Sequence, residues 1–192
     1  MSVEGRPLDE QELIARSRDG DTGAFEQLVR IHQGIALRVA YLVVRDHSEA
    51  EDVTQDAFVK AFGSLGRFRP GAPLRPWLLR IVRNEALNRV RSRKRRERLA
   101  LRAGYDPVSG DAVPSPEAVV TTEDLNQRVL DALDGLPERH RSVVAHRFLL
   151  DLSERETARV LGIPVGTVKS RTARALDKLR AQLDPLEVRR DG

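Results

Sequence analysis

The chain has 192 residues, of which 40% are hydrophobic and 32% charged, a composition that suits one large or two small globular domains. No stretch approaches the roughly 18 apolar residues of a membrane span, and the acidic start, MSVEGRPLDEQEL, lacks the apolar region of a signal peptide. The absence of cysteine excludes disulfides and thiolate metal sites within the chain, and we expect a cytoplasmic protein.

The formal net charge of +4 conceals blocks of opposite sign along the sequence. Residues 1–66 carry 7 basic and 12 acidic residues, whereas residues 67–102 carry 13 basic and 2 acidic residues, a net charge of +11. Residues 103–134 are again acidic (−6), and residues 135–192 are basic (+4). A basic block of this size favours a polyanionic partner such as nucleic acid over the alternative of merely solvated helix faces.

The N-terminal half predicts three amphipathic helices. The first covers residues 21–44, because apolar residues recur there every three or four positions: Phe25, Leu28, Val29, Ile35, Val39 and Leu42. The second covers residues 48–62, with Ser48 and Glu51 at capping-box spacing, Gly63 and Gly66 at its end, and four residues inward: Val53, Phe58, Ala61 and Phe62. After a loop rich in Pro and Gly, the third begins near Leu74, places Trp77 in the core, and continues into the basic stretch NRVRSRKRRER.

Residues 103–122 contain three prolines and two glycines, which predicts a linker between two domains. Four helices are expected beyond it: one near residues 125–136, one opened by Pro137, one over residues 153–162 and one from about Pro164. Ser153 and Glu156 form a second capping-box pattern, and Ala158, Gly162 and Val168 fit a helix-turn-helix. The last helix then has the place of a recognition helix in a DNA major groove, with its polar residues Lys169, Ser170, Arg171 and Arg174 outward.

Catalytic patterns are weak in this sequence. Its four histidines include no pair at the i, i+4 spacing of a helical zinc site, and there is no phosphate-binding Gly-rich loop. Two other function classes stay open at this point. One is a helix-turn-helix transcription regulator with a helical sensor domain, and the other is a nucleic-acid enzyme whose Glu51, Asp52 and Asp56 hold magnesium.

The order of these motifs resembles the bacterial RNA polymerase sigma factors, in particular the extracytoplasmic-function (ECF) group of the sigma-70 family. GDTGAFEQLVRIHQGIALRVAYLVVRDHSEAEDVTQDAFVKAF and LGRFRPGAPLRPWLLRIVRNEALNRVRSRKRR are similar to sigma region 2, and LPERHRSVVAHRFLLDLSERETARVLGIPVGTVKSRTARALDKLR is similar to region 4. The resemblance implies an all-α fold of two small helical domains joined by a flexible acidic linker. The expected boundaries are an N-terminal helical extension at 1–20, region 2 at 21–102, the linker at 103–122, region 4 at 123–183 and a tail at 184–192.

The resemblance also implies a function: an alternative, non-enzymatic factor that binds core RNA polymerase at its clamp and flap and directs it to promoter DNA. Core binding falls on Asp52, Val53, Gln55, Asp56 and Phe58. Minus-10 DNA binding falls on Arg80, Arg83, Asn84, Asn88, Arg89 and Arg91, with Phe68 as the aromatic candidate for stacking on an extruded base. Minus-35 binding falls on Lys169, Ser170, Arg171 and Arg174, although Thr172 and Ala173 depart from the residues usual in the family.

Sigma factors of this group are commonly held inactive by an anti-sigma factor, which can be membrane-anchored, so we expect such a partner. No cofactor, metal or direct membrane contact is expected for this chain. In the family, the segment equivalent to the linker runs toward the polymerase active-site cleft. The acidic residues Asp106, Asp111 and Glu117 suit that path by imitating a nucleic-acid backbone, and a passive tether is the alternative.

Overall fold

The computed structural model describes residues 9–102 and 132–183. The chain divides into two compact units, residues 1–108 and 109–192, and each is described by itself. The described residues form helices and their connections, with no strand among them, which confirms the predicted all-α class. None of these helices is long and apolar enough to cross a membrane. The predicted linker at 103–122 and most of the helix predicted at 125–136 lie outside the described residues, so both stay predictions.

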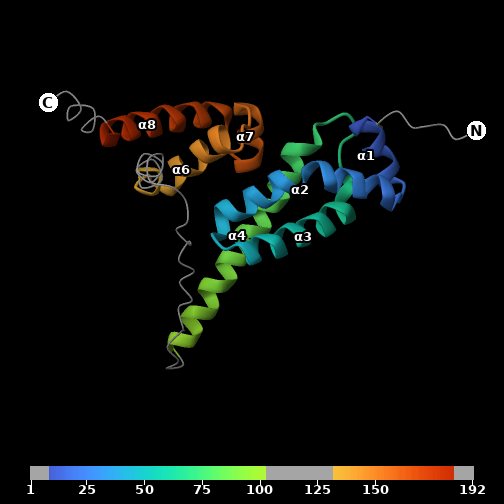
Figure 1. Cartoon of the computed structure of the whole chain (residues 1–192), viewed down its shortest axis with the longest axis horizontal. Helices are drawn as coiled ribbons and strands as arrows, with labels where there is room; N and C mark the ends of the chain where they lie inside the picture. Colours follow the sequence, from blue (N-terminus) through green and yellow to red (C-terminus); the bar gives the residue numbers. More distant parts are fainter. Residues whose placement is uncertain (1–8, 103–131, 184–192) are drawn as a thin grey trace, which may run out of the picture. The chain divides into compact units, whose positions relative to one another are not determined.

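The first unit contains α1 (Glu10–Arg18), α2 (Thr22–Val44), α3 (His47–Ser64), the short 3-10 turn η1 (Leu65–Arg67) and α4 (Leu74–Arg102). Helices α2, α3 and α4 pack against one another, and the C-terminal half of α4 runs on past the ends of the other two (Figure 1). The apolar stripes predicted from spacing form the core, since Leu28, Ile35 and Val39 are buried on α2 and Val53, Phe58 and Ala61 on α3. Trp77 packs half-buried against this core, as predicted.

Helix α1 is part of this packing. Its Leu13 and Ile14 are buried in one cluster with Leu28 of α2. A part-buried hydrogen bond of 2.8 Å joins Glu10 Oε1 of α1 to His32 Nε2 of α2. The sequence pattern predicted a helical extension at 1–20, and the described part of it is fixed to the unit by both apolar and polar contacts.

Side-chain caps fix where the helices of this unit begin. Asp21 accepts a hydrogen bond from the backbone N–H of Ala24 at 3.0 Å at the start of α2. Asp46 accepts one from the N–H of Glu49 at 2.7 Å at the start of α3. The predicted cap at Ser48 is therefore wrong, because Ser48 already lies inside the helix and Asp46 is the residue with extended backbone.

The second unit contains α6 (Glu138–Val144), the π-helical turn η2 (Ala145–Leu149), α7 (Glu154–Leu161) and α8 (Val165–Leu183). Pro137 occupies the N-cap position of α6, directly before its first helical residue. The predicted capping box is present on α7, where the Ser153 and Glu156 side chains each accept from the other's backbone N–H. Gly162 has the left-handed backbone expected of the turn, with φ of 68°. Val168 is fully buried against Val143 and packs α8 back on the unit, which confirms the predicted helix-turn-helix.

Candidate nucleic-acid and protein interfaces

One face of α4 presents polar side chains in a continuous exposed row. Arg80, Asn84, Asn88 and Arg91 follow one another at intervals of four, four and three residues, so they lie along the same side of the helix. All four are exposed, whereas Leu79, Val82 and Ala86 on the other side of the helix are buried in the core. We call these four residues the α4 polar row. Its two amides can hydrogen-bond to base edges, and the guanidinium groups on either side of them can bind phosphates.

The remaining predicted minus-10 residues lie differently. Arg83 and Arg89 are half-buried. Arg89 turns toward α3, where its Nη2 lies 3.5 Å from Asp56 Oδ2 and its Nη1 lies 3.9 Å from Asp52 Oδ2. The sequence pattern gave no sign of these ion pairs, because it does not show which residues of two helices face each other.

The prediction for Phe68 needs a correction. Phe68 is only 4% exposed, and its ring lies 4.9 Å from the Trp77 ring, centroid to centroid. It belongs to the core cluster that holds Leu65 and Leu74. A base cannot stack on a ring whose faces are covered, so Phe68 contributes to the core of the unit and is not available as a stacking platform.

On α8, the predicted DNA-binding side chains lie around the exposed side of a well-seated helix. Lys169, Ser170 and Arg174 are exposed and Arg171 is half-buried, while Val168 and Ala175 behind them are fully buried. Lys169 Nζ lies 3.7 Å from Glu154 Oε2 on α7, and the Ser170 hydroxyl donates to the backbone oxygen of Thr167 at 3.2 Å. These contacts are exposed and weak, so both side chains can exchange them for other partners.

A buried histidine lies beneath this helix. His140 of α6 is 4% exposed, and its Nδ1 has no hydrogen-bond partner within the described residues. Burial lowers the pKa of His140 below its ordinary value of 6.5, and nearby positive charges lower it further: Arg139 of α6 and Lys178, Arg171 and Arg174 of α8. The imidazole is therefore neutral at pH 7.

The predicted polymerase-binding residues on α3 divide into exposed and buried sets. Asp52, Gln55 and Asp56 are exposed and form an acidic face. Val53 is 1% exposed and belongs to the core, so its predicted direct contact with a partner is corrected, whereas Phe58, 8% exposed, lines a groove between α2 and α3. A side chain that packs inside its own unit supports the acidic face without touching a protein bound there.

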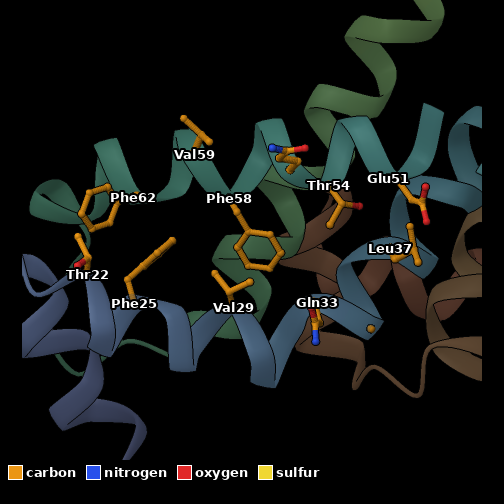
Figure 2. Close-up of a pocket in the computed structure, with 12 residues that line it drawn as sticks. Thr22, Phe25, Val29, Gln33, Leu37, Glu51, Thr54, Phe58, Val59 and Phe62 are labelled. Atoms are coloured by element: carbon orange, nitrogen blue, oxygen red, sulfur yellow. The ribbon is translucent and has the colours of Figure 1, made fainter. Parts of the chain in front are cut away.

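An apolar groove with a volume of about 770 Å³ lies between α2 and α3, next to the acidic face. Figure 2 shows Phe25 and Val29 of α2 pointing toward Phe58 and Phe62 of α3 across this groove, with Glu51 and Thr54 toward its other end. The Phe25 ring centroid lies 4.8 Å from that of Phe62 and 6.4 Å from that of Phe58. The periodicity of the sequence predicted Phe62 in the core, but its side chain is 37% exposed. Because Phe62 was expected to be buried, the sequence did not predict an open groove beside it.

Among the described residues, no group of three or more His, Asp or Glu side chains is arranged to hold a metal ion. Asp52 and Asp56 instead lie beside Arg89, and Glu51 lies beside His47, with Oε1 3.4 Å from Nδ1. Asp52 and Asp56 thus take part in ion pairs within the unit.

Comparison with known proteins agrees with this geometry. Residues 28–96 match the family described as Sigma-70 region 2, and residues 126–179 match Sigma-70, region 4. The chain is 35% identical to the RNA polymerase sigma-H factor of Pseudomonas aeruginosa over 92% of its length and 95% of the relative's. It is 33% identical to the ECF RNA polymerase sigma factor SigW of Bacillus subtilis, over 90% of its length and 96% of the relative's.

Two solved structures have similar folds and come from complexes. CnrH, solved with the cytosolic domain of CnrY, has a TM-score of 0.65 and 29% identity and covers 93% of this chain and 99% of its own. The sigma factor RpoE, solved with the anti-sigma factor NepR from Bartonella quintana, has a TM-score of 0.63 and 27% identity over 83% of this chain and 96% of its own. With both regions matched and relatives similar over nearly their whole length, the chain belongs to the ECF group of the sigma-70 family of RNA polymerase sigma factors.

Proposed function

We propose that this chain binds core RNA polymerase and directs it to promoters whose minus-10 element is read by the first unit and whose minus-35 element is read by the second. The observation that carries the proposal is that each unit exposes a cationic helix face on a buried apolar support, α4 in one and α8 in the other. A factor that reads two separated promoter elements needs two such faces.

The α4 polar row suits recognition of an extruded base. An Asn amide presents a donor and an acceptor, so Asn84 can pair with a base edge, while Arg80 and Arg91 on either side neutralise phosphates. Extruding a base costs a few kcal/mol, which hydrogen bonds in a pocket recover. Because Phe68 is buried, this proposal assigns recognition to the amides and guanidinium groups of α4 alone.

The exposed side of α8 suits duplex DNA. The major groove admits one helix, and Arg and Lys side chains there favour guanine edges. Lys169, Arg171 and Arg174 would supply these contacts, with Ser170 hydrogen-bonding a base or a phosphate. The left-handed Gly162 makes the turn between α7 and α8, and buried Val168 seats α8 on the unit, which leaves its exposed side free for the groove.

Polymerase binding is assigned to α2 and α3. The apolar groove with Phe25, Phe58 and Phe62 supplies buried area, and the acidic face of Asp52, Gln55 and Asp56 supplies charge complementary to a basic partner. Contacts of the second unit with the flap of the polymerase are expected from the family. We propose that an anti-sigma factor, as NepR is in the complex with the similar RpoE structure, inhibits the chain by covering the same surfaces.

Run-off transcription from a promoter with both elements tests this function. We expect transcripts only when the chain and core polymerase are both present, with Asp52→Arg/Gln55→Ala weakening core binding and Glu12→Arg/Gln11→Ala, on the exposed side of α1, serving as the matched control. A transcription regulator would instead bind duplex DNA tightly without core polymerase. Equal core affinity for the two double variants would remove the assignment of the acidic face.

A further inference from the structure

A regular series of ion pairs joins α3 to α4. Glu49 Oε2 lies 3.1 Å from Arg93 Nη1, Asp52 and Asp56 lie within 3.9 Å of Arg89, and Glu85 Oε1 lies 2.5 Å from Lys60 Nζ. We call this series the α3–α4 seam. Residue numbers rise along α3 while they fall along α4, as antiparallel helices require. The seam is accessible to solvent, since Asp52 and Asp56 are 61% and 68% exposed and Arg89 is 31% exposed.

Arg89 occupies a special place in this seam. Successive residues of an α-helix are about 100° apart, so Arg89 lies one step around α4 from Asn88, at the border between the surface that packs on α3 and the α4 polar row. The carboxylates that hold it, Asp52 and Asp56, are two of the three residues of the acidic face. One guanidinium therefore links the surface proposed for polymerase to the surface proposed for DNA.

We propose that Arg89 couples polymerase binding to DNA binding. In the free chain, Asp52 and Asp56 hold the Arg89 guanidinium away from DNA, and Arg89 in turn neutralises these carboxylates toward a basic partner. When a basic polymerase surface takes over the two carboxylates, Arg89 is released to contact a DNA phosphate. This inference rests on the proposed function and adds to it a physical link through which polymerase binding would raise the affinity for DNA.

The size of the effect follows from the exposure of the pairs. Solvent-exposed ion pairs are individually weak and exchange readily, so the two contacts to Arg89 should change affinity by about two- to tenfold together. Coupling between two binding sites is reciprocal: if polymerase raises the affinity for DNA by some factor through Arg89, DNA raises the affinity for polymerase by the same factor. Exposed pairs are suited to this exchange, because a buried pair would be too costly to break.

The first arm of the test uses the full chain without polymerase and a minus-10 fork-junction oligonucleotide. Asp52→Asn/Asp56→Asn should bind this DNA about two- to tenfold more tightly than Glu12→Gln/Glu26→Gln, which removes the same charge from exposed positions outside the seam. The steepness of the salt dependence should also rise by about one phosphate contact. Equal DNA affinity for the two double variants would overturn the proposal.

The second arm measures affinity for core polymerase and then the affinity of the complex for the same DNA. Arg89→Gln should bind core polymerase more tightly than wild type, because its acidic face is no longer neutralised, and should lose part of the rise in DNA affinity that polymerase causes. If Arg89 only held α3 against α4, Arg89→Gln would lower the melting temperature and leave the coupling unchanged, which would overturn the proposal. Wild type that fails to bind core polymerase would refute the proposed function itself, an outcome distinct from both.

Discussion

At the scale of single residues, burial decides which side chains can meet a partner. Asn84 and Arg80 are exposed on α4, whereas Phe68, equally suitable by chemical type, is enclosed with Trp77 and Leu74. Phe68 lies in a short segment rich in glycine and proline and has no periodic apolar neighbours in the sequence, so the direction of its side chain could not be predicted. The exposed direction of the α4 polar row could be predicted, because its residues lie on a long helix whose apolar stripe defines the buried side.

Asn84 should discriminate between bases where Arg91 does not. We expect Asn84→Ala to cost about 1–3 kcal/mol at one minus-10 position, because an amide pairs with one base edge. Arg91→Ala should weaken binding to all sequences alike and reduce the salt slope by about one. Competition binding of the chain with core polymerase, across all single-base variants of the element, measures both. A uniform loss for Asn84→Ala would contradict a role in reading the base.

His140 should make the second unit sensitive to acid. Because burial lowers its pKa in the folded chain below the ordinary 6.5, the unfolded chain binds more protons as the pH falls below 6.5. The free energy of unfolding should therefore be fully retained above about pH 7.5 and decrease as the pH falls through 6.5. Urea unfolding followed by amide signals of residues 132–183 measures this dependence. His140→Leu should flatten it and His47→Gln, at an exposed histidine, should not; an unchanged slope in His140→Leu would refute the assignment.

At the scale of elements, caps and periodic stripes were the most informative features of the sequence. The capping box at Ser153 was predicted correctly from the spacing of Ser153 and Glu156, and α2 and α8 followed from their apolar spacing. At the start of α3, Asp46 and Ser48 were both chemically suitable, and only backbone geometry distinguishes them. The π-helical turn η2 was not predicted. It continues α6 with hydrogen bonds that span one residue more than those of an α-helix, and the apolar spacing of so short a segment does not distinguish the two.

The correction at α3 leads to a stability prediction. Asp46→Ala should lower the free energy of unfolding of the first unit by about 0.5–2 kcal/mol, because the N–H of Glu49 loses its acceptor. Ser48→Ala, at the second residue of the helix, should change it by less than about 0.5 kcal/mol. Urea unfolding of the full chain followed by amide signals of residues 47–64 measures both. The reverse order of the two losses would restore Ser48 as the cap.

At the scale of the whole molecule, the alternation of charge along the chain predicted two units with basic faces, and the structure adds how each face is supported. Neither the groove between α2 and α3 nor the α3–α4 seam could be predicted, because both depend on which side chains of different helices meet. The DNA contacts of the two units should nevertheless be separable, since each face belongs to one compact unit. Substituting a base-contacting residue in one unit should then lower promoter affinity only when the promoter element read by that unit is present.

Arg171→Ala/Arg174→Ala tests this separation. On a promoter with both elements, the variant with core polymerase should lose about 1–3 kcal/mol of binding for each guanine contact removed. On a promoter whose minus-35 element is replaced, the loss should shrink to the weaker, sequence-independent contribution of phosphate contacts, because no specific contact is left to remove.

Arg139→Ala/Arg180→Ala removes the same charge from exposed positions of the second unit outside the predicted contacts and should bind both promoters nearly as well as wild type. Asn84→Ala should lose the same increment on either promoter, since the first unit reads an element common to both. An equal loss on both promoters for Arg171→Ala/Arg174→Ala would mean that α8 supplies general charge, and the minus-35 assignment would then fail while the minus-10 assignment stood.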